Sequence, residues 1–313
     1  EIVTNLDEMK KVNLAVKEKY PEDAEWIKRV DEKLQKREEN QEKYDAYQKR
    51  EEAAKTFKDL RLIADDMMAE LDDKYYAQKL LKYGMEKLNS QQFNVDNYKK
   101  LIQSIDKYLQ DEKWIDNIIN NLLKKIVQFF FDYCGLAHLA KDEFPNKDKG
   151  VELAKTILET YESKLESKAE KTVYDYTDLA KAVYSILDDK GWAINLIKKA
   201  EDCSPDMYAY AYLGYLSKLY GDDNLSQTYY DKCKSNLKTA ADYRALAERM
   251  KSLNVETSVI KDIYANGINI SNPNEKLLWT EGLTNIFNAV NWAKQVYSKI
   301  AADFKTAEEK ELY

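Results

Sequence analysis

Few residues of this 313-residue sequence are suited to metal, nucleophilic or acid–base chemistry. His138 is the only histidine, and the sequence has neither a second histidine nor a paired cysteine to act with it. The three cysteines, Cys134, Cys203 and Cys233, are widely spaced, which fits neither a disulfide framework nor a metal-ligand motif. A zinc site or a Ser-His-Asp triad needs more groups than these. The sequence therefore predicts no enzyme activity, no metal and no cofactor, with His138 at the core or its boundary and the cysteines buried.

Paired carboxylates are the other residues that suggest chemistry. Asp72-Asp73, Asp188-Asp189 and Asp222-Asp223 each lie in a short polar segment between apolar stretches. Acid–base catalysis of the glycosidase type needs two carboxylates that face each other across a cleft. Aspartate is also a natural turn and helix N-cap residue. Because the pairs recur at equivalent places, we interpret them as turns. No glycine-rich phosphate loop and no EF-hand loop occurs.

Composition indicates the elements that carry these residues. Only 8 glycines and 4 prolines occur, well below average usage, which favours long helices with few turns. Charged residues make up 34% of the chain, with interspersed signs and a net charge of -7, so no nucleic-acid partner is expected. The most apolar run, 126–140, is shorter than the roughly 20 residues that span a bilayer, so no transmembrane segment is expected. The chain begins at Glu1 without methionine, which leaves a cytoplasmic protein and an exported mature form both open.

A repeat dominates the sequence. Each copy has a leucine-like residue, about four mostly polar residues, a mostly large anchor residue, and apolar residues three and four positions beyond it. The spacing of the anchors is 38–39 residues as far as Trp192 and 33–34 residues after it. We expect the anchors to be buried between neighbouring repeats. The seven anchors are Tyr76, Trp114, Leu153, Trp192, Leu225, Ser258 and Trp292.

A second apolar stripe precedes each anchor. Before Trp192 it consists of Tyr176, Leu179, Ala180 and Val183, with the offsets of one face of an α-helix. Each repeat is therefore a helix A, a polar turn and a helix B. One hairpin cannot bury its apolar face alone, so neighbours must stack. The predicted fold is all-α, an α-solenoid of about seven stacked helical hairpins.

The second half of the chain resembles a degenerate tetratricopeptide (TPR) repeat array, best over residues 173–302. The first matching unit has Tyr176, Leu179, Ala180, Val183, Ala193, Ile197, Ala200 and Pro205 on the TPR spacing. The next has Tyr210, Leu213, Gly214, Gly221, Ser226, Tyr230 and Cys233. The resemblance implies a right-handed superhelix whose concave surface is lined by helices A and binds a partner.

The resemblance also implies which side chains face that groove, namely those between the core positions of helices A. They are Tyr174, Lys181, Tyr184, Tyr208, Tyr215, Lys218, Arg244 and Glu248. Aromatic and cationic groups together favour an acidic protein or peptide partner. We therefore expect a non-enzymatic, protein-binding scaffold. The alternative is a structural subunit of a larger assembly, which associates laterally or through its N-terminal arm. Oligomeric state stays open, as does the origin of the 24 tyrosines in recognition or in codon usage.

Four segments follow from these patterns. Residues 1–58 form a charged helical arm or cap with a long polar helix, and a docking role and a capping role are both open. Residues 59–170 hold the longer hairpins, and the extra length of the third is expected in the loop-like segment 142–150. Residues 171–302 hold the TPR-like hairpins, and 303–313 form a polar tail.

Overall fold

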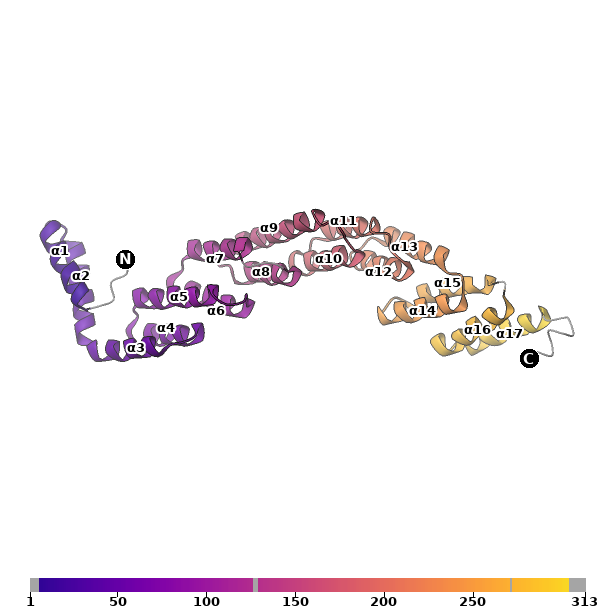
Figure 1. Cartoon of the computed structure of the whole chain (residues 1–313), viewed down its shortest axis with the longest axis horizontal. Coiled ribbons are helices and arrows are strands. Elements are labelled where there is room, and N and C mark those ends of the chain that lie inside the picture. The colour runs from indigo at the N-terminus through magenta and orange to yellow at the C-terminus, as the bar shows by residue number, and fades with distance from the viewer. Residues whose placement is uncertain (1–5, 126–128, 271, 304–313) are drawn as a thin grey trace. The chain divides into compact units, whose positions relative to one another are not determined.

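The computed structural model describes residues 6–125, 129–270 and 272–303 (Figure 1). These residues form seventeen α-helices and one short 3-10 helix, with no strand among them. The predicted all-α class is therefore confirmed. The chain divides into two compact units, Glu1–Tyr161 and Glu162–Tyr313. No helix in the described part of the chain combines the length and apolar content needed to cross a bilayer.

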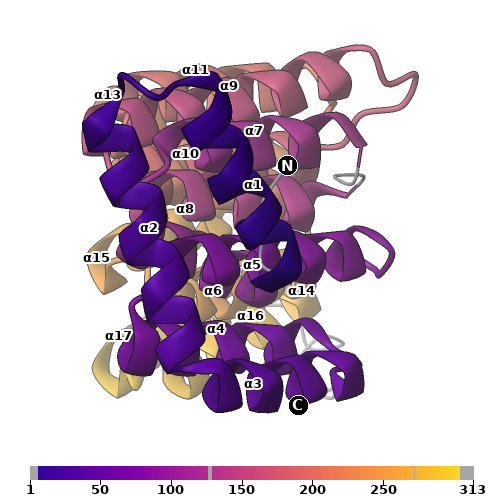
Figure 2. The same cartoon turned by 90° about the vertical axis from the view of Figure 1, so that its left-hand side faces the viewer.

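The first unit begins with α1 and α2, which lie side by side as a hairpin (Figure 2). The predicted long polar helix is wrong in one respect: α2 ends and α3 begins at Asn40, whose backbone leaves the helical region at φ -111° and ψ 23°. Helix α3 packs on α4, and α4 on α5. The helices are α1 (Leu6–Lys19), α2 (Ala24–Glu39), α3 (Gln41–Ala53), α4 (Phe57–Leu71), α5 (Lys74–Asn89), α6 (Val95–Leu109), α7 (Glu112–Lys125), α8 (Phe130–Glu143) and α9 (Lys147–Glu166).

The second unit takes in the end of α9 and all later helices. Its helices pack as consecutive pairs, α10 with α11, α12 with α13, α14 with α15 and α16 with α17. Contacts also join α12 to α14 and α14 to α16. The helices are α10 (Val173–Leu187), α11 (Lys190–Glu201), α12 (Met207–Leu219), α13 (Asp223–Asn236), α14 (Ala240–Ser252), α15 (Thr257–Ala265), the 3-10 helix η1 (Asn266–Asn269), α16 (Pro273–Phe287) and α17 (Val290–Asp303).

Aspartates shape the turns between paired helices, as the sequence suggested. Asp72 and Asp188 are the C-caps of α4 and α10 and adopt the left-handed conformation, with φ of 47° and 54°. The next residue caps the following helix, because the Asp73 carboxylate accepts from Tyr76 N at 3.0 Å and that of Asp189 from Trp192 N at 2.9 Å. These carboxylates therefore serve the backbone, which confirms the turn interpretation.

Three helices begin with the same Thr-x-x-Asp capping box, at Thr56, Thr172 and Thr239. At α10 the Thr172 hydroxyl accepts from Asp175 N at 3.2 Å, and the Asp175 carboxylate accepts from Thr172 N at 2.8 Å. Each box satisfies two backbone donors that the helix itself cannot bond. Burial favours a higher pKa for Asp175, but hydrogen bonds from Thr172 and Lys168 outweigh it and hold this pKa below its usual value.

The core confirms the helix A stripes but corrects the anchors. Tyr176, Leu179, Ala180 and Val183 are all buried. Trp192, in contrast, is half-buried, and its indole Nε1 donates to Glu162 Oε2 at 2.8 Å. Trp114 and Trp292 are half-buried too, and of the seven anchors only Tyr76, at 3% exposed, is buried as expected. In the other repeats the buried positions follow the anchor, as Ala77 also does after Tyr76. The buried positions after the anchors are Ala77, Ile115, Ala154, Ala193, Ser226 and Ala293, and at the sixth repeat Ile260, one residue later than the predicted register.

The extra length of the third hairpin lies in a helix and not in the predicted loop. The connection from α8 to α9 is only 144–146, and α9 has 20 residues. Gly150, near its start, permits this, since an added Cβ would lie 2.6 Å from Ala140 O. The glycine that suggested a loop thus serves close packing of two helices.

Gly214 in α12 is another close approach. A Cβ at this position would lie 2.6 Å from Cε1 of Tyr230, which is 3% exposed on the paired helix α13. The Ser226 hydroxyl donates to the Gly214 carbonyl at 2.7 Å across the same contact. The α12–α13 pair therefore depends on a missing side chain at 214.

Gly214→Ala is expected to destabilise the chain by about 1–3 kcal/mol, because overpacking outweighs the gain in helix propensity. Gly191→Ala is the matched control, since Gly191 is exposed in α11 and its added Cβ meets only Asp189 Oδ1 at 3.5 Å. That change should stabilise by up to about 1 kcal/mol. Urea denaturation of both variants measures the difference. A Gly214→Ala protein as stable as the parent would disprove the close contact.

Asp175→Asn is expected to lower the free energy of unfolding by about 0.5–1 kcal/mol near neutral pH, because it weakens the capping box of α10. Because the folded pKa of Asp175 is depressed, its contribution is present above the unfolded value of 3.8 and is lost as the pH falls through the folded pKa. The stability gap between parent and variant should therefore shrink from about pH 6 to about pH 3 in urea titrations. Asp188→Asn, at an exposed left-handed C-cap, is the control and should leave stability unchanged. A gap that stays constant with pH would contradict this.

Candidate interaction surface

The eight residues predicted to bind a partner lie on three helices of the second unit. Tyr174, Lys181 and Tyr184 are on α10, Tyr208, Tyr215 and Lys218 on α12, and Arg244 and Glu248 on α14. Three of them belong to one group that joins α10 to α12. We call this group the tyrosine cluster; it comprises Lys181, Tyr184, Tyr212, Tyr215 and Tyr220.

Ring contacts hold the tyrosine cluster together. The rings of Tyr184 and Tyr220 lie 4.8 Å apart at 48°, and those of Tyr212 and Tyr215 lie 6.4 Å apart at 15°. Lys181 Nζ is 5.8 Å from the centroid of the Tyr212 ring, a cation–π distance. Tyr220 is 3% exposed, and the other three tyrosines are half-buried. The cluster therefore presents partly exposed rings over a buried one.

Lys181 is the charged member of the tyrosine cluster. Lys181 Nζ bonds Asp178 Oδ1 at 2.6 Å. Burial favours a lower pKa for Lys181, yet hydrogen bonds with Asp178 and Tyr212 outweigh it and raise this pKa above its usual value. Burial, reinforced by neighbouring tyrosines, raises the pKa of Tyr220. At neutral pH Lys181 therefore carries its charge, and the buried phenol of Tyr220 is uncharged.

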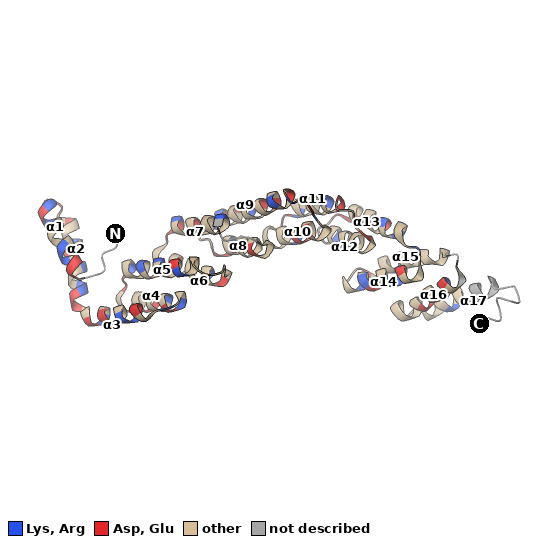
Figure 3. Ribbon diagram, viewed as in Figure 1, with Lys and Arg blue, Asp and Glu red and all other residues tan. Residues whose placement is uncertain are grey.

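The other predicted cations are paired within the chain. Lys218 Nζ lies 2.9 Å from Glu256, and Arg244 Nε bonds Glu248 Oε1 at 3.1 Å. All four side chains are more than two-fifths exposed, so these pairs are weak and open to exchange. Figure 3 shows Lys and Arg interspersed with Asp and Glu along α10 to α15. Each of the three predicted cations, Lys181, Lys218 and Arg244, thus has a carboxylate partner within the chain.

Besides Lys218, Arg244 and Glu248, two predicted tyrosines lie outside the tyrosine cluster. Tyr174, in the first turn of α10, is 54% exposed, and Tyr208 packs against the core of the second unit. Two members of the cluster were not among the predicted residues. Tyr212 could have been found from its i, i+3 spacing to Tyr215, whereas Tyr220 lies at the C-cap of α12, where the helical register no longer applies.

The histidine and the three cysteines differ in how far they are buried. His138 is 53% exposed and 3.7 Å from Asp142, so the expected core or boundary position is wrong. Cys233 is buried as expected, while Cys134 and Cys203 are half-buried. Burial raises the pKa of the Cys203 thiol and that of Cys233, to about 12 in the latter. Within the described residues no three His, Cys, Asp or Glu side chains are grouped to hold a metal ion.

Tyr220→Phe is expected to leave stability unchanged or raise it by about 1 kcal/mol. The Tyr220 hydroxyl is buried and has no hydrogen-bond partner, so removing it relieves the cost of an unsatisfied polar group. Tyr264→Phe is the control, because the Tyr264 hydroxyl donates to the Trp279 carbonyl at 2.8 Å and its loss should cost about 1–2 kcal/mol. Thermal unfolding measures both. Equal losses in the two variants would show that Tyr220 has a partner in solution.

Comparison with known proteins adds no relative to this description. No protein-family model matches the sequence, and no curated protein matches it. The function must therefore be argued from the residues and contacts given above.

Proposed function

We propose that this chain is a non-enzymatic scaffold that binds a protein or peptide through the tyrosine cluster on α10 and α12. The observation that supports this is the cluster itself, with three half-buried phenol rings and one ammonium group gathered where two helices meet. Tyrosine is enriched in the cores of protein interfaces, because it supplies rigid contact area and a polar hydroxyl at low entropic cost.

The proposed architecture is an α-solenoid of TPR-like hairpins. Stacked hairpins should contact each other through helices A and separately through helices B. In the second unit α12 contacts α14 and α14 contacts α16. Among the helices B, the Tyr229 hydroxyl of α13 donates to the Ile197 carbonyl of α11 at 3.5 Å, and Lys234 of α13 pairs with Asp262 of α15 at 2.8 Å. Buried small residues at TPR positions, such as Ala180, Ala193 and Gly214, support the same interpretation.

The expected partner segment is short and carries both apolar and acidic groups. Half-buried rings of Tyr184, Tyr212 and Tyr215 offer apolar faces, and their hydroxyls offer hydrogen bonds. A carboxylate of the partner would compete with Asp178 for Lys181, whose side chain is 46% exposed. Since an exposed ion pair contributes at most about 1 kcal/mol, this exchange costs little.

Tyr215→Ala and Lys181→Glu are expected to weaken binding of the partner at least tenfold, which corresponds to about 1.4 kcal/mol. Lys198→Glu is the matched control, since it reverses the same charge at an exposed position on helix B α11 and should change the affinity less than about twofold.

The full chain is used to capture the partner from cells of the source, and the partner is then produced separately. Calorimetric titration measures its affinity for the parent protein and for each of the three variants. Circular dichroism confirms that each variant is folded. Equal affinities for all four proteins, or an equal loss in Lys198→Glu, would refute the proposed surface.

A further inference from the structure

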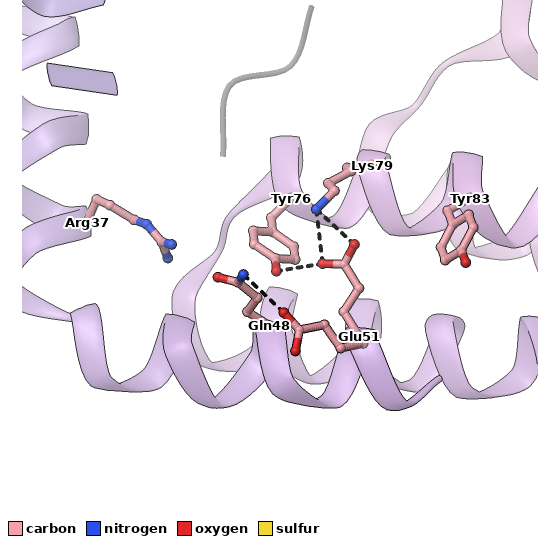
Figure 4. Close-up of a pocket in the computed structure, with 7 residues that line it drawn as sticks. Arg37, Gln48, Glu51, Tyr76, Lys79 and Tyr83 are labelled. Atoms are coloured by element: carbon pink, nitrogen blue, oxygen red, sulfur yellow. Dashed lines mark hydrogen bonds and ion pairs between the residues drawn. The ribbon is translucent and has the colours of Figure 1, made fainter. Parts of the chain in front are cut away.

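A polar pocket lies in the first unit, among α2, α3 and α5, and is separate from the proposed partner surface. Its volume is about 450 Å³. Figure 4 shows the Arg37 guanidinium pointing toward Gln48 and Tyr76, with Glu51 bonded to Tyr76 and Lys79. The residues that line it are Arg37, Gln48, Glu51, Glu52, Tyr76, Lys79 and Tyr83.

Arg37 is the unusual member of this pocket. It is 5% exposed, and its Nε and Nη1 are buried without a hydrogen-bond partner. Its guanidinium lies 3.4 Å from the centroid of the Tyr44 ring, a favourable cation–π contact. Burial lowers the pKa of Arg37, although guanidinium stays charged in proteins. A buried charge without hydrogen-bond acceptors is costly, so this group is set up for a ligand that supplies them.

The carboxylates around Arg37 bond other groups. Asp73 accepts from the Tyr44 hydroxyl at 2.8 Å and caps α5. Glu51 accepts from the Tyr76 hydroxyl at 2.7 Å and pairs with Lys79 at 2.8 Å. Exposed Glu52 accepts from Gln48 at 3.3 Å. Asp45 is exposed and bonds Gln41 at 2.6 Å. The protein thus neutralises Lys79 but leaves Arg37 without an acceptor.

We propose that this pocket binds one carboxylate group, which accepts hydrogen bonds from the Arg37 guanidinium. Arginine matches the planar geometry of a carboxylate and often bonds it through two N–H groups. A monoanion matches the single charge of the guanidinium and supplies the acceptors that its Nε and Nη1 lack. A phosphate dianion would bring a second negative charge next to Glu51 and Glu52, which disfavours it.

The test uses the full chain with ¹⁵N-labelled arginine, which gives six Nε–Hε signals, one per arginine of the sequence. Arg37→Lys identifies the Arg37 signal by its loss. The probes are sodium acetate, the capped tripeptide acetyl-Gly-Glu-Gly-amide, sodium phosphate and, for ionic strength, sodium chloride. We expect the Arg37 signal to shift saturably with acetate and the tripeptide, and at least tenfold more weakly with phosphate.

The two carboxylate probes distinguish the sources of the group. A tripeptide that binds at least tenfold more tightly than acetate supports an acidic side chain of a peptide as the ligand. Equal affinities support a free small carboxylate. An Arg37 signal that moves with neither probe, or moves equally with chloride or phosphate, overturns the proposal.

Arg37→Met provides a second test that does not need the Arg37 signal. Removing a buried charged group whose Nε and Nη1 lack hydrogen-bond acceptors should leave the midpoint of thermal unfolding unchanged or raised in chloride buffer. It should also abolish the rise in midpoint that the better-binding carboxylate probe gives the parent protein. Arg50→Met, at an arginine paired with Asp66 at 2.6 Å, is the control and should keep that rise. An Arg37→Met protein that still responds to the probe would overturn the carboxylate site.

Discussion

Each helical hairpin of this chain has an apolar side that its own two helices cannot cover completely. Side chains such as Leu179, Val183 and Ile197 are fully buried. Contacts of α11 with α12, α12 with α14 and α14 with α16 join successive pairs of the second unit. This constraint explains why most of the core consists of two short stripes per repeat. Charged residues of both signs are interspersed along the helices (Figure 3). The core of the second unit accordingly runs through successive pairs, from Ala211 of α12 to Val296 of α17.

Periodicity made much of this fold predictable from the sequence. The apolar positions of helices A repeat every three to four residues, so Tyr176, Leu179 and Val183 could be placed in the core from the sequence. The anchors were less predictable, because a motif fixes the position of Trp192 relative to the turn but not how deeply its ring is covered. The break at Asn40 contains neither proline nor glycine, and the loop-like composition at 142–150 conceals the first turn of α9.

The two candidate sites were predictable to different degrees. Helix register identified Lys181, Tyr184 and Tyr215, since these positions depend on a single helix at a time. Tyr220 belongs to the tyrosine cluster because a turn brings it there, and Arg37 lines its separate pocket because three helices meet around it. No local sequence pattern describes either arrangement. Arg37 in particular lies in a highly charged segment, where a charged side chain is normally expected in solvent. Burial of such a group is a property of the tertiary structure alone.

The contact between Gly214 and Tyr230 has a consequence for how the sequence can change over time. The space that a side chain at 214 would occupy is already filled by the ring at 230. A larger residue at the first position is therefore tolerable only beside a smaller one at the second. The two positions, one on each helix of a pair, should consequently covary among descendants of this sequence. That covariation would record the pairing of α12 with α13 in the sequences themselves.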